Sequence, residues 1–125
     1  MEEATKKHIL VVEDDPTNRG LIKQILEKKY KVDVANDAIS ALEKLSEQHY
    51  DLITIDINLP FGINGIELAK KIRAQEGFEA TPLVAITAYV SDFTKELCLE
   101  KGFDYHIEKP FDVVKFEKLI SDILG

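Results

Sequence analysis

Residues 51–60 decide the fold, and they read Asp51-Leu52-Ile53-Thr54-Ile55-Asp56-Ile57-Asn58-Leu59-Pro60. The centre of this stretch is a short apolar run with an acidic residue at each end. Runs of this kind, rich in Ile and Val, predict strands that are buried on both faces, as in a parallel sheet. Four further runs share this character, the second and the last being more polar, as edge strands are: His8–Val12, Val32–Ala35, Leu83–Ile86 and Tyr105–Ile107.

Segments of helical length separate these runs. Each of four segments carries an apolar stripe at helical spacing, with stripe residues Leu21/Ile22/Ile25/Leu26, Ala38/Leu42/Leu45, Ile66/Ala69/Ile72 and Phe116/Leu119/Ile120/Ile123. A fifth segment, Ser91–Lys101, is less clearly striped. Asp15 before Pro16 predicts a helix start, and Gly102 predicts a helix stop. Strand and helix thus alternate five times, which predicts a parallel sheet with helices on both faces.

The composition indicates one ordinary globular domain. The chain has 125 residues, of which 45% are hydrophobic, and this is enough for a single core. No apolar run approaches the ~20 residues of a membrane span, and the N-terminus lacks a signal-peptide pattern. The single cysteine, Cys98, excludes an internal disulfide and fits a reducing compartment. We therefore expect a cytoplasmic protein that does not insert into membranes.

The net charge of −7 argues against direct binding of nucleic acid. This charge either serves solubility alone or is partly gathered at a cation site. The positions that follow the strands test the second alternative, because the carboxyl ends of parallel strands meet at one edge of the sheet.

Four of the five predicted strands end in residues able to do chemistry: Glu13-Asp14-Asp15, Asp56, Thr87 and Lys109-Pro110. Taken singly, each of these residues can be explained by a structural role, as a helix cap, a turn residue or a residue that favours strands. Together they place several carboxylates at one point, which is tolerable with a cation among them. An all-oxygen set suits Mg²⁺ or Mn²⁺ rather than zinc. Lysine and threonine suit phosphate oxygens, and one carboxylate remains to attack phosphorus.

These motifs, with Ile9–Asp15, Asp51–Pro60, Ile86-Thr87-Ala88 and Lys109-Pro110-Phe111 in this order, resemble the receiver domain of two-component response regulators. The resemblance covers about residues 7–124. It implies a flavodoxin-like, doubly wound (βα)5 fold with strand order 2-1-3-4-5. It also implies a single receiver domain over residues 1–125, with no effector domain in the chain.

The resemblance implies a role for each acidic position. Asp56 matches the phosphoacceptor. Asp14, Asp56 and the backbone carbonyl of Asn58 match the Mg²⁺ ligands, and Glu13 matches the acid that acts through water.

Three further positions match the phosphoryl-stabilising and switch residues. Thr87 matches the hydroxyl that moves towards the phosphoryl group, and Lys109 matches the lysine that pairs with it. His106 stands where an aromatic switch residue is usual. It either only fills that place, or its protonation biases the switch. Asn58 and Tyr89 match positions that tune the dephosphorylation rate.

The resemblance also implies partners. The phosphoryl group comes from a phosphohistidine of a sensor histidine kinase or histidine phosphotransfer protein, and the fourth helix, fifth strand and fifth helix present the result to a downstream protein target. We expect a monomer or weak dimer that catalyses only its own phosphorylation and dephosphorylation. The segment Pro60–Gly65 has one residue more than the usual pattern; it either bulges outwards or alters docking.

Three alternatives are weighed against this interpretation. A haloacid dehalogenase-type phosphatase needs a second Asp where Asn58 stands. A flavodoxin-like electron carrier needs a phosphate loop where Glu13-Asp14-Asp15 would repel phosphate. A degenerate receiver, acting as a phosphorylation-independent binding module, usually lacks one of the acids, the Asp or the Lys, all of which are present here.

Overall fold

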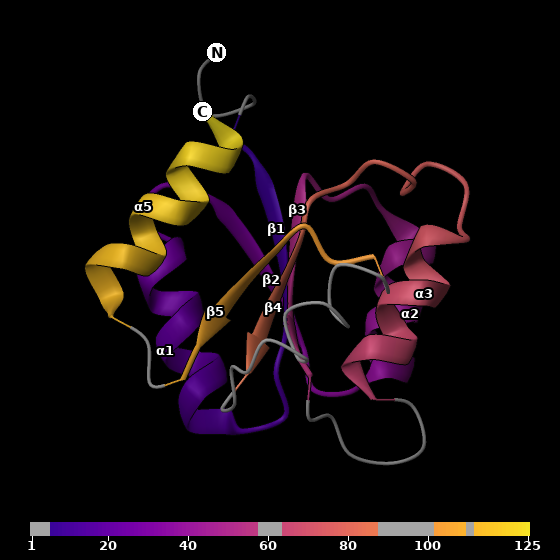
Figure 1. Cartoon of the computed structure of the whole chain (residues 1–125), viewed down its shortest axis with the longest axis horizontal. Helices are drawn as coiled ribbons and strands as arrows, with labels where there is room; N and C mark the ends of the chain where they lie inside the picture. The colour runs from indigo at the N-terminus through magenta and orange to yellow at the C-terminus, as the bar shows by residue number, and fades with distance from the viewer. Residues whose placement is uncertain (1–5, 58–63, 88–101, 110–111) are drawn as a thin grey trace.

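The computed structural model describes residues 6–57, 64–87, 102–109 and 112–125. Its strands form one parallel sheet in the order β2-β1-β3-β4-β5 (Figure 1), which confirms the expected order and the placing of the two polar strands at the edges. The strands are β1 (His8–Val12), β2 (Lys31–Ala35), β3 (Leu52–Asp56), β4 (Leu83–Thr87) and β5 (Tyr105–Glu108).

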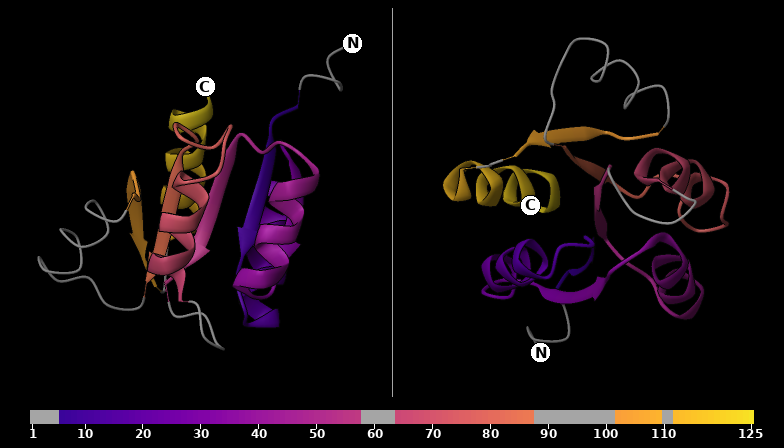
Figure 2. Two further views of the ribbon diagram at one scale, coloured as in Figure 1. Left: turned by 90° about the vertical axis from the view of Figure 1, so that its right-hand side faces the viewer. Right: turned by 90° about the horizontal axis from the view of Figure 1, so that it is seen from below.

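Four helices occur in the described residues and cover both faces of the sheet (Figure 2). They are α1 (Pro16–Leu26), α2 (Ala38–Glu47), α3 (Gly65–Arg73) and α5 (Val113–Leu124). The helix expected at Ser91–Lys101 lies outside the described residues. In the described part of the chain, no helix combines the length and the apolar character that crossing a membrane requires.

Each face of the sheet has its own apolar cluster, which accounts for the runs and stripes of the sequence. On one face Leu10, Ile53 and Ile55 pack with the buried residues of α2 and α3. On the other, Ile9 and Val84 pack with those of α1 and α5. All five residues of β3 and of β4 are buried, as the strands of a doubly covered sheet should be.

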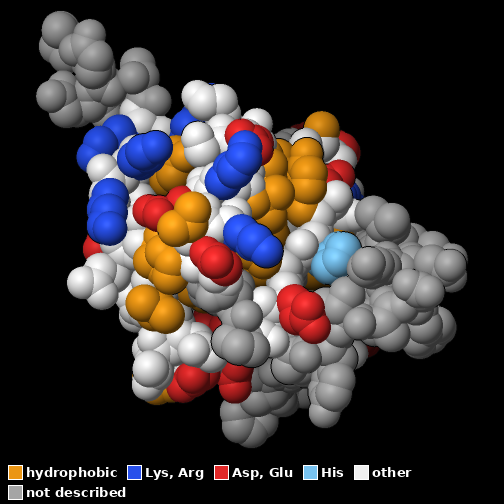
Figure 3. Space-filling model, turned by 60° about the vertical axis from the view of Figure 1, so that its left-hand side comes forward, with side chains coloured by type: hydrophobic (Ala, Val, Ile, Leu, Met, Phe, Trp, Pro, Cys, Tyr) orange, Lys and Arg blue, Asp and Glu red, His pale blue; other side chains and the backbone are white. Residues whose placement is uncertain are grey.

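The helices begin at side-chain caps near the carboxyl edge of the sheet. The Asp15 carboxylate accepts from Thr17 N, and Pro16 follows as the first helical residue, as the sequence predicts. Asn64 and Glu67 form a capping box at the start of α3. Away from the carboxyl edge, the outer face formed by α5 and α1 carries Lys and Arg beside Asp and Glu, with hydrophobic side chains between them (Figure 3).

Candidate functional site

The acidic residues gather at the carboxyl edge of the sheet, as predicted. Glu13 and Asp14 follow β1, and Asp56 ends β3, the neighbouring strand. One carboxylate oxygen from each of these residues lies within 4.8 Å of the others. Glu13 and Asp56 are almost wholly buried, whereas Asp14 is more exposed. The parallel topology thus produces the expected cluster of three acids.

Lys109, which follows β5, brings a positive charge to this cluster. Its Nζ lies 3.0 Å from Asp56 Oδ2 and 3.4 Å from Glu13 Oε1. Burial acts to lower the pKa of Lys109, but the hydrogen bond and charge of Asp56 outweigh it and raise the pKa above its ordinary value. The lysine therefore stays protonated beside the acids.

Glu13 has the largest pKa shift among the described residues of the site. Burial, followed by the hydrogen bond and negative charge of Asp56, raises the pKa of Glu13 to about 7. Its Oε2 accepts from Asp15 N at 3.2 Å, while its buried Oε1 has no hydrogen-bond partner among the described residues. A divalent cation would relieve both conditions, and the donor set of carboxylate oxygens fits Mg²⁺ or Mn²⁺.

Thr87 belongs to β4, which pairs with β3, and His106 belongs to β5, the next strand outwards. Thr87 is buried at the end of β4, directly after Ile86, which pairs with Asp56. Its carbonyl accepts from Lys109 N at 2.7 Å, which ties the lysine to the strand end. His106 is half-buried in β5 opposite Ala85.

Several predicted features lie outside the described residues. Asn58, Tyr89 and residues 60–63 of the lengthened segment are among them, so their expected roles stay predictions. Of the Pro60–Gly65 segment the structure describes Asn64 and Gly65, the residues at the start of α3.

Gly65 is a site residue that the sequence analysis missed. Its N–H donates to Ile57 O at 2.9 Å, and a Cβ at this position would lie 2.5 Å from Asp56 O. Only glycine allows α3 to approach the end of β3 so closely. The Asn64-Gly65 pair with Glu67 three residues after Asn64 was the available signal, since it marks a helix start.

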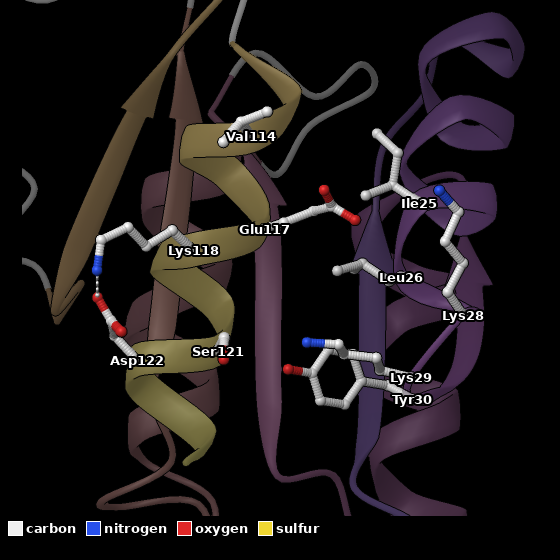
Figure 4. Close-up of a pocket in the computed structure, with 10 residues that line it drawn as sticks. All are labelled: Ile25, Leu26, Lys28, Lys29, Tyr30, Val114, Glu117, Lys118, Ser121 and Asp122. Atoms are coloured by element: carbon white, nitrogen blue, oxygen red, sulfur yellow. Dashed lines mark hydrogen bonds and ion pairs between the residues drawn. The ribbon is translucent and has the colours of Figure 1, made fainter.

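The described surface also has a groove of about 460 Å³ between α1 and α5. Ile25, Leu26 and Val114 lie along it, and Lys28 and Lys118 lie at its sides (Figure 4). None of the three clustered acids lines it. This groove is therefore separate from the acid cluster, whose three carboxylate oxygens lie close enough together to bind a cation.

Comparison with known proteins agrees with this geometry. The response regulator receiver domain family matches residues 9–121. The response regulator ArlR of Staphylococcus aureus is 38% identical over 117 residues, which are 93% of this chain and 52% of that protein. The chain thus spans about half the length of the curated relatives it matches.

Solved structures show the same fold. Chemotaxis protein CheY4 of Vibrio cholerae superposes with a TM-score of 0.90 at 27% identity, covering 94% of this chain and 98% of that one. The receiver domain of sensor histidine kinase PA1611 of Pseudomonas aeruginosa, solved with a magnesium ion in its active site cleft, superposes with a TM-score of 0.86 at 32% identity, covering 96% and 99%. The chain belongs to the response regulator receiver domain family.

Proposed function

We propose that this receiver accepts a phosphoryl group on Asp56 in a Mg²⁺-dependent reaction. The observation that carries the proposal is the placement of Asp56 Oδ2 3.0 Å from Lys109 Nζ, with carboxylates of Glu13 and Asp14 within 4.8 Å. A lone aspartate cap would need neither the half-buried lysine nor the two additional acids.

Asp56 acts as the nucleophile. One carboxylate oxygen attacks phosphorus in line and forms the O–P bond of an acyl phosphate, while the P–N bond of the donor phosphohistidine breaks and its electron pair stays on the imidazole. Lys109 offsets the charge of the transferring group. Asp14, Asp56 and the carbonyl of Asn58 would hold Mg²⁺, with Glu13 acting through water. The metal, when bound, neutralises part of the phosphoryl charge.

Phosphorylation then changes the surface. The Thr87 hydroxyl donates to a phosphoryl oxygen, and its movement frees space near β5. His106 turns towards that space, which repacks the surface to which β5, α5 and the helix predicted at Ser91–Lys101 contribute. The phosphoryl group thus biases a two-state element that a downstream protein reads.

The partners follow from this chemistry. The donor is a phosphohistidine of a sensor histidine kinase or a histidine phosphotransfer protein, and the chain works as a monomer or weak dimer in the cytoplasm. It turns over no substrate other than its own aspartyl phosphate.

The test is labelling by a small phosphodonor such as acetyl phosphate. We expect the intact chain to gain the mass of one phosphoryl group with Mg²⁺, and not in excess EDTA. Asp56→Asn should gain none. Labelling that persists in Asp56→Asn would move the acceptor elsewhere. An absence of labelling, with no spectral response to beryllofluoride and Mg²⁺, would favour a phosphorylation-independent binding module instead.

A further inference from the structure

The acidic loop after β1 is held in place by a residue of α1, Arg19. The Arg19 Nη1 donates to Glu13 O at 3.1 Å and to Asp14 O at 3.3 Å. Arg19 is half-buried and sits in the first turn of α1, where its own N–H donates to Asp15 O at 2.8 Å. The side chain therefore folds back over the loop that its helix follows.

The two carbonyls that Arg19 contacts belong to the peptide groups on either side of Asp14. Fixing both peptide planes fixes φ and ψ of Asp14, and with them the direction in which its side chain leaves the backbone. The same arrangement holds Glu13, because its N–H donates to Ala35 O at 3.0 Å while its carbonyl accepts from Arg19. One guanidinium thus fixes the backbone conformation of both acidic residues.

The position of Arg19 is otherwise unfavourable. A cation in the first turn of a helix opposes the helix dipole. Generic helix stability would place Arg19 at the other end of α1, where Lys23 lies. The contacts with Glu13 and Asp14 supply the reason for its place.

We propose that Arg19 is a positioning residue for the metal site: it orients Glu13 and Asp14 so that their carboxylates converge on a divalent cation. This inference rests on the proposed function, because it presupposes that the acid cluster binds Mg²⁺ or Mn²⁺. It assigns Arg19 no contact with the metal or with the phosphoryl group.

Charge and position make opposite predictions, which allows a decisive test. If Arg19 acted through its charge alone, removing that charge would tighten binding of a divalent cation, and lysine would substitute for it. If Arg19 acts by position, Lys and Gln are both inadequate, since neither offers the planar, extended guanidinium that reaches the two carbonyls. Both residues favour helix, so α1 is retained.

The experiment is a titration of the full chain with Mn²⁺, following free Mn²⁺ by electron paramagnetic resonance without phosphodonor. We expect Arg19→Lys and Arg19→Gln each to weaken the Mn²⁺ Kd about tenfold, as loss of groups that orient metal ligands does. Circular dichroism checks that both variants fold. The matched control is Arg73→Lys, an arginine that also donates to backbone carbonyls but lies at the opposite edge of the sheet; its Kd should stay within twofold of the parent.

The outcomes separate the two proposals. An Arg19→Lys Kd within twofold of the parent, or tighter binding by Arg19→Gln, would overturn the role of Arg19 and leave the metal site standing. The metal site itself would be overturned if the parent chain bound no Mn²⁺. It would also be overturned if the Asp14→Asn variant bound Mn²⁺ as tightly as the parent does.

Discussion

The two edges of the sheet both carry buried or half-buried charges, but they are arranged differently. At the carboxyl edge three carboxylates lie together, and Lys109 pairs with only two of them, those of Asp56 and Glu13. Glu13 Oε1 has no hydrogen-bond partner among the described residues. At the amino edge acids are matched with donors. Asp104, for example, accepts from Arg73 at 2.7 Å and from Leu83 N at 2.9 Å. The uncompensated edge is suited to binding, and the compensated edge to stability.

Arg73 is the centre of the compensated edge. Besides its ion pair with Asp104, its guanidinium donates to four backbone carbonyls, those of Phe78, Glu79, Thr81 and Gly102, at 2.6–3.3 Å. These contacts join the end of α3 to the segments that lead into β4 and β5. The amino ends of two strands are therefore fixed at one point.

The largest expected effect on stability comes from breaking this edge. Arg73→Ala should lower the free energy of unfolding by about 3 kcal/mol, because it leaves a carboxylate and several carbonyls without their donor. Urea denaturation measures the loss. Lys71→Ala, an exposed neighbour on α3, is the control and should change stability by no more than about 0.5 kcal/mol. An Arg73→Ala loss as small as the control's would mean that the amino edge is not compensated in the way described.

The carboxyl edge should show its excess of acid as a pH dependence. The raised pKa of Glu13, about 7 against 4.5, means that the folded chain binds more protons than the unfolded chain between these values. In EDTA, stability should therefore fall as pH rises from about 4.5 to about 7, by up to about 3 kcal/mol.

The control for this effect is Glu13→Gln, which should abolish the fall with pH. Addition of Mg²⁺ near pH 7.5 should raise the free energy of unfolding of the parent, because the cation takes the place of the proton. The increase should be smaller for the variant. If the stability of the parent chain in EDTA does not change between pH 4.5 and 7, the pKa of Glu13 is not raised in the folded chain.

The sequence predicts the carboxyl edge much better than the amino edge, for a topological reason. Parallel strands bring their carboxyl ends together whatever path the loops take. The sequence alone therefore predicts that Glu13, Asp56 and Lys109 lie close together. The partners of Arg73 lie on loops up to 31 residues away in the chain, and no local pattern joins them. The close approach of Gly65 and the backward reach of Arg19 depend on loop paths in the same way.

A second amino-edge network illustrates the same limit, because the sequence analysis gave His8 no role. Asp33 Oδ2 accepts from Tyr50 Oη at 2.8 Å and lies 2.8 Å from His8 Nε2. Burial acts to raise the pKa of Asp33, but the hydrogen bond from Tyr50 and the charge of His8 outweigh it and lower the pKa below its ordinary value. Asp33 therefore adds stability above pH 3.8, and this is lost as pH falls below that value.

Tyr50→Phe should weaken this network with an intermediate effect. We expect a loss of about 1–2 kcal/mol at neutral pH, as for a hydrogen bond to a charged acceptor, because the ring stays in place and only the donor is removed. The loss should shrink at acidic pH, well below 3.8, as Asp33 takes up a proton. Thermal unfolding of the parent and the variant at both pH values measures it, and a loss that is equal at both would place the effect in packing rather than in the Asp33 contact.

The smallest expected effect lies between the two edges, in the middle of β3. Thr54 is fully buried, and its hydroxyl has no hydrogen-bond partner among the described residues. Thr54→Val keeps the shape of the side chain and removes the desolvated hydroxyl, so it should raise the free energy of unfolding by up to about 1 kcal/mol. Unlike a change at either edge, it should leave both the Mn²⁺ affinity and the pH dependence of stability unchanged. Urea denaturation at pH 5 and pH 7.5 tests this, and a destabilised variant would show that the hydroxyl contributes to holding β3, and with it Asp56, in place.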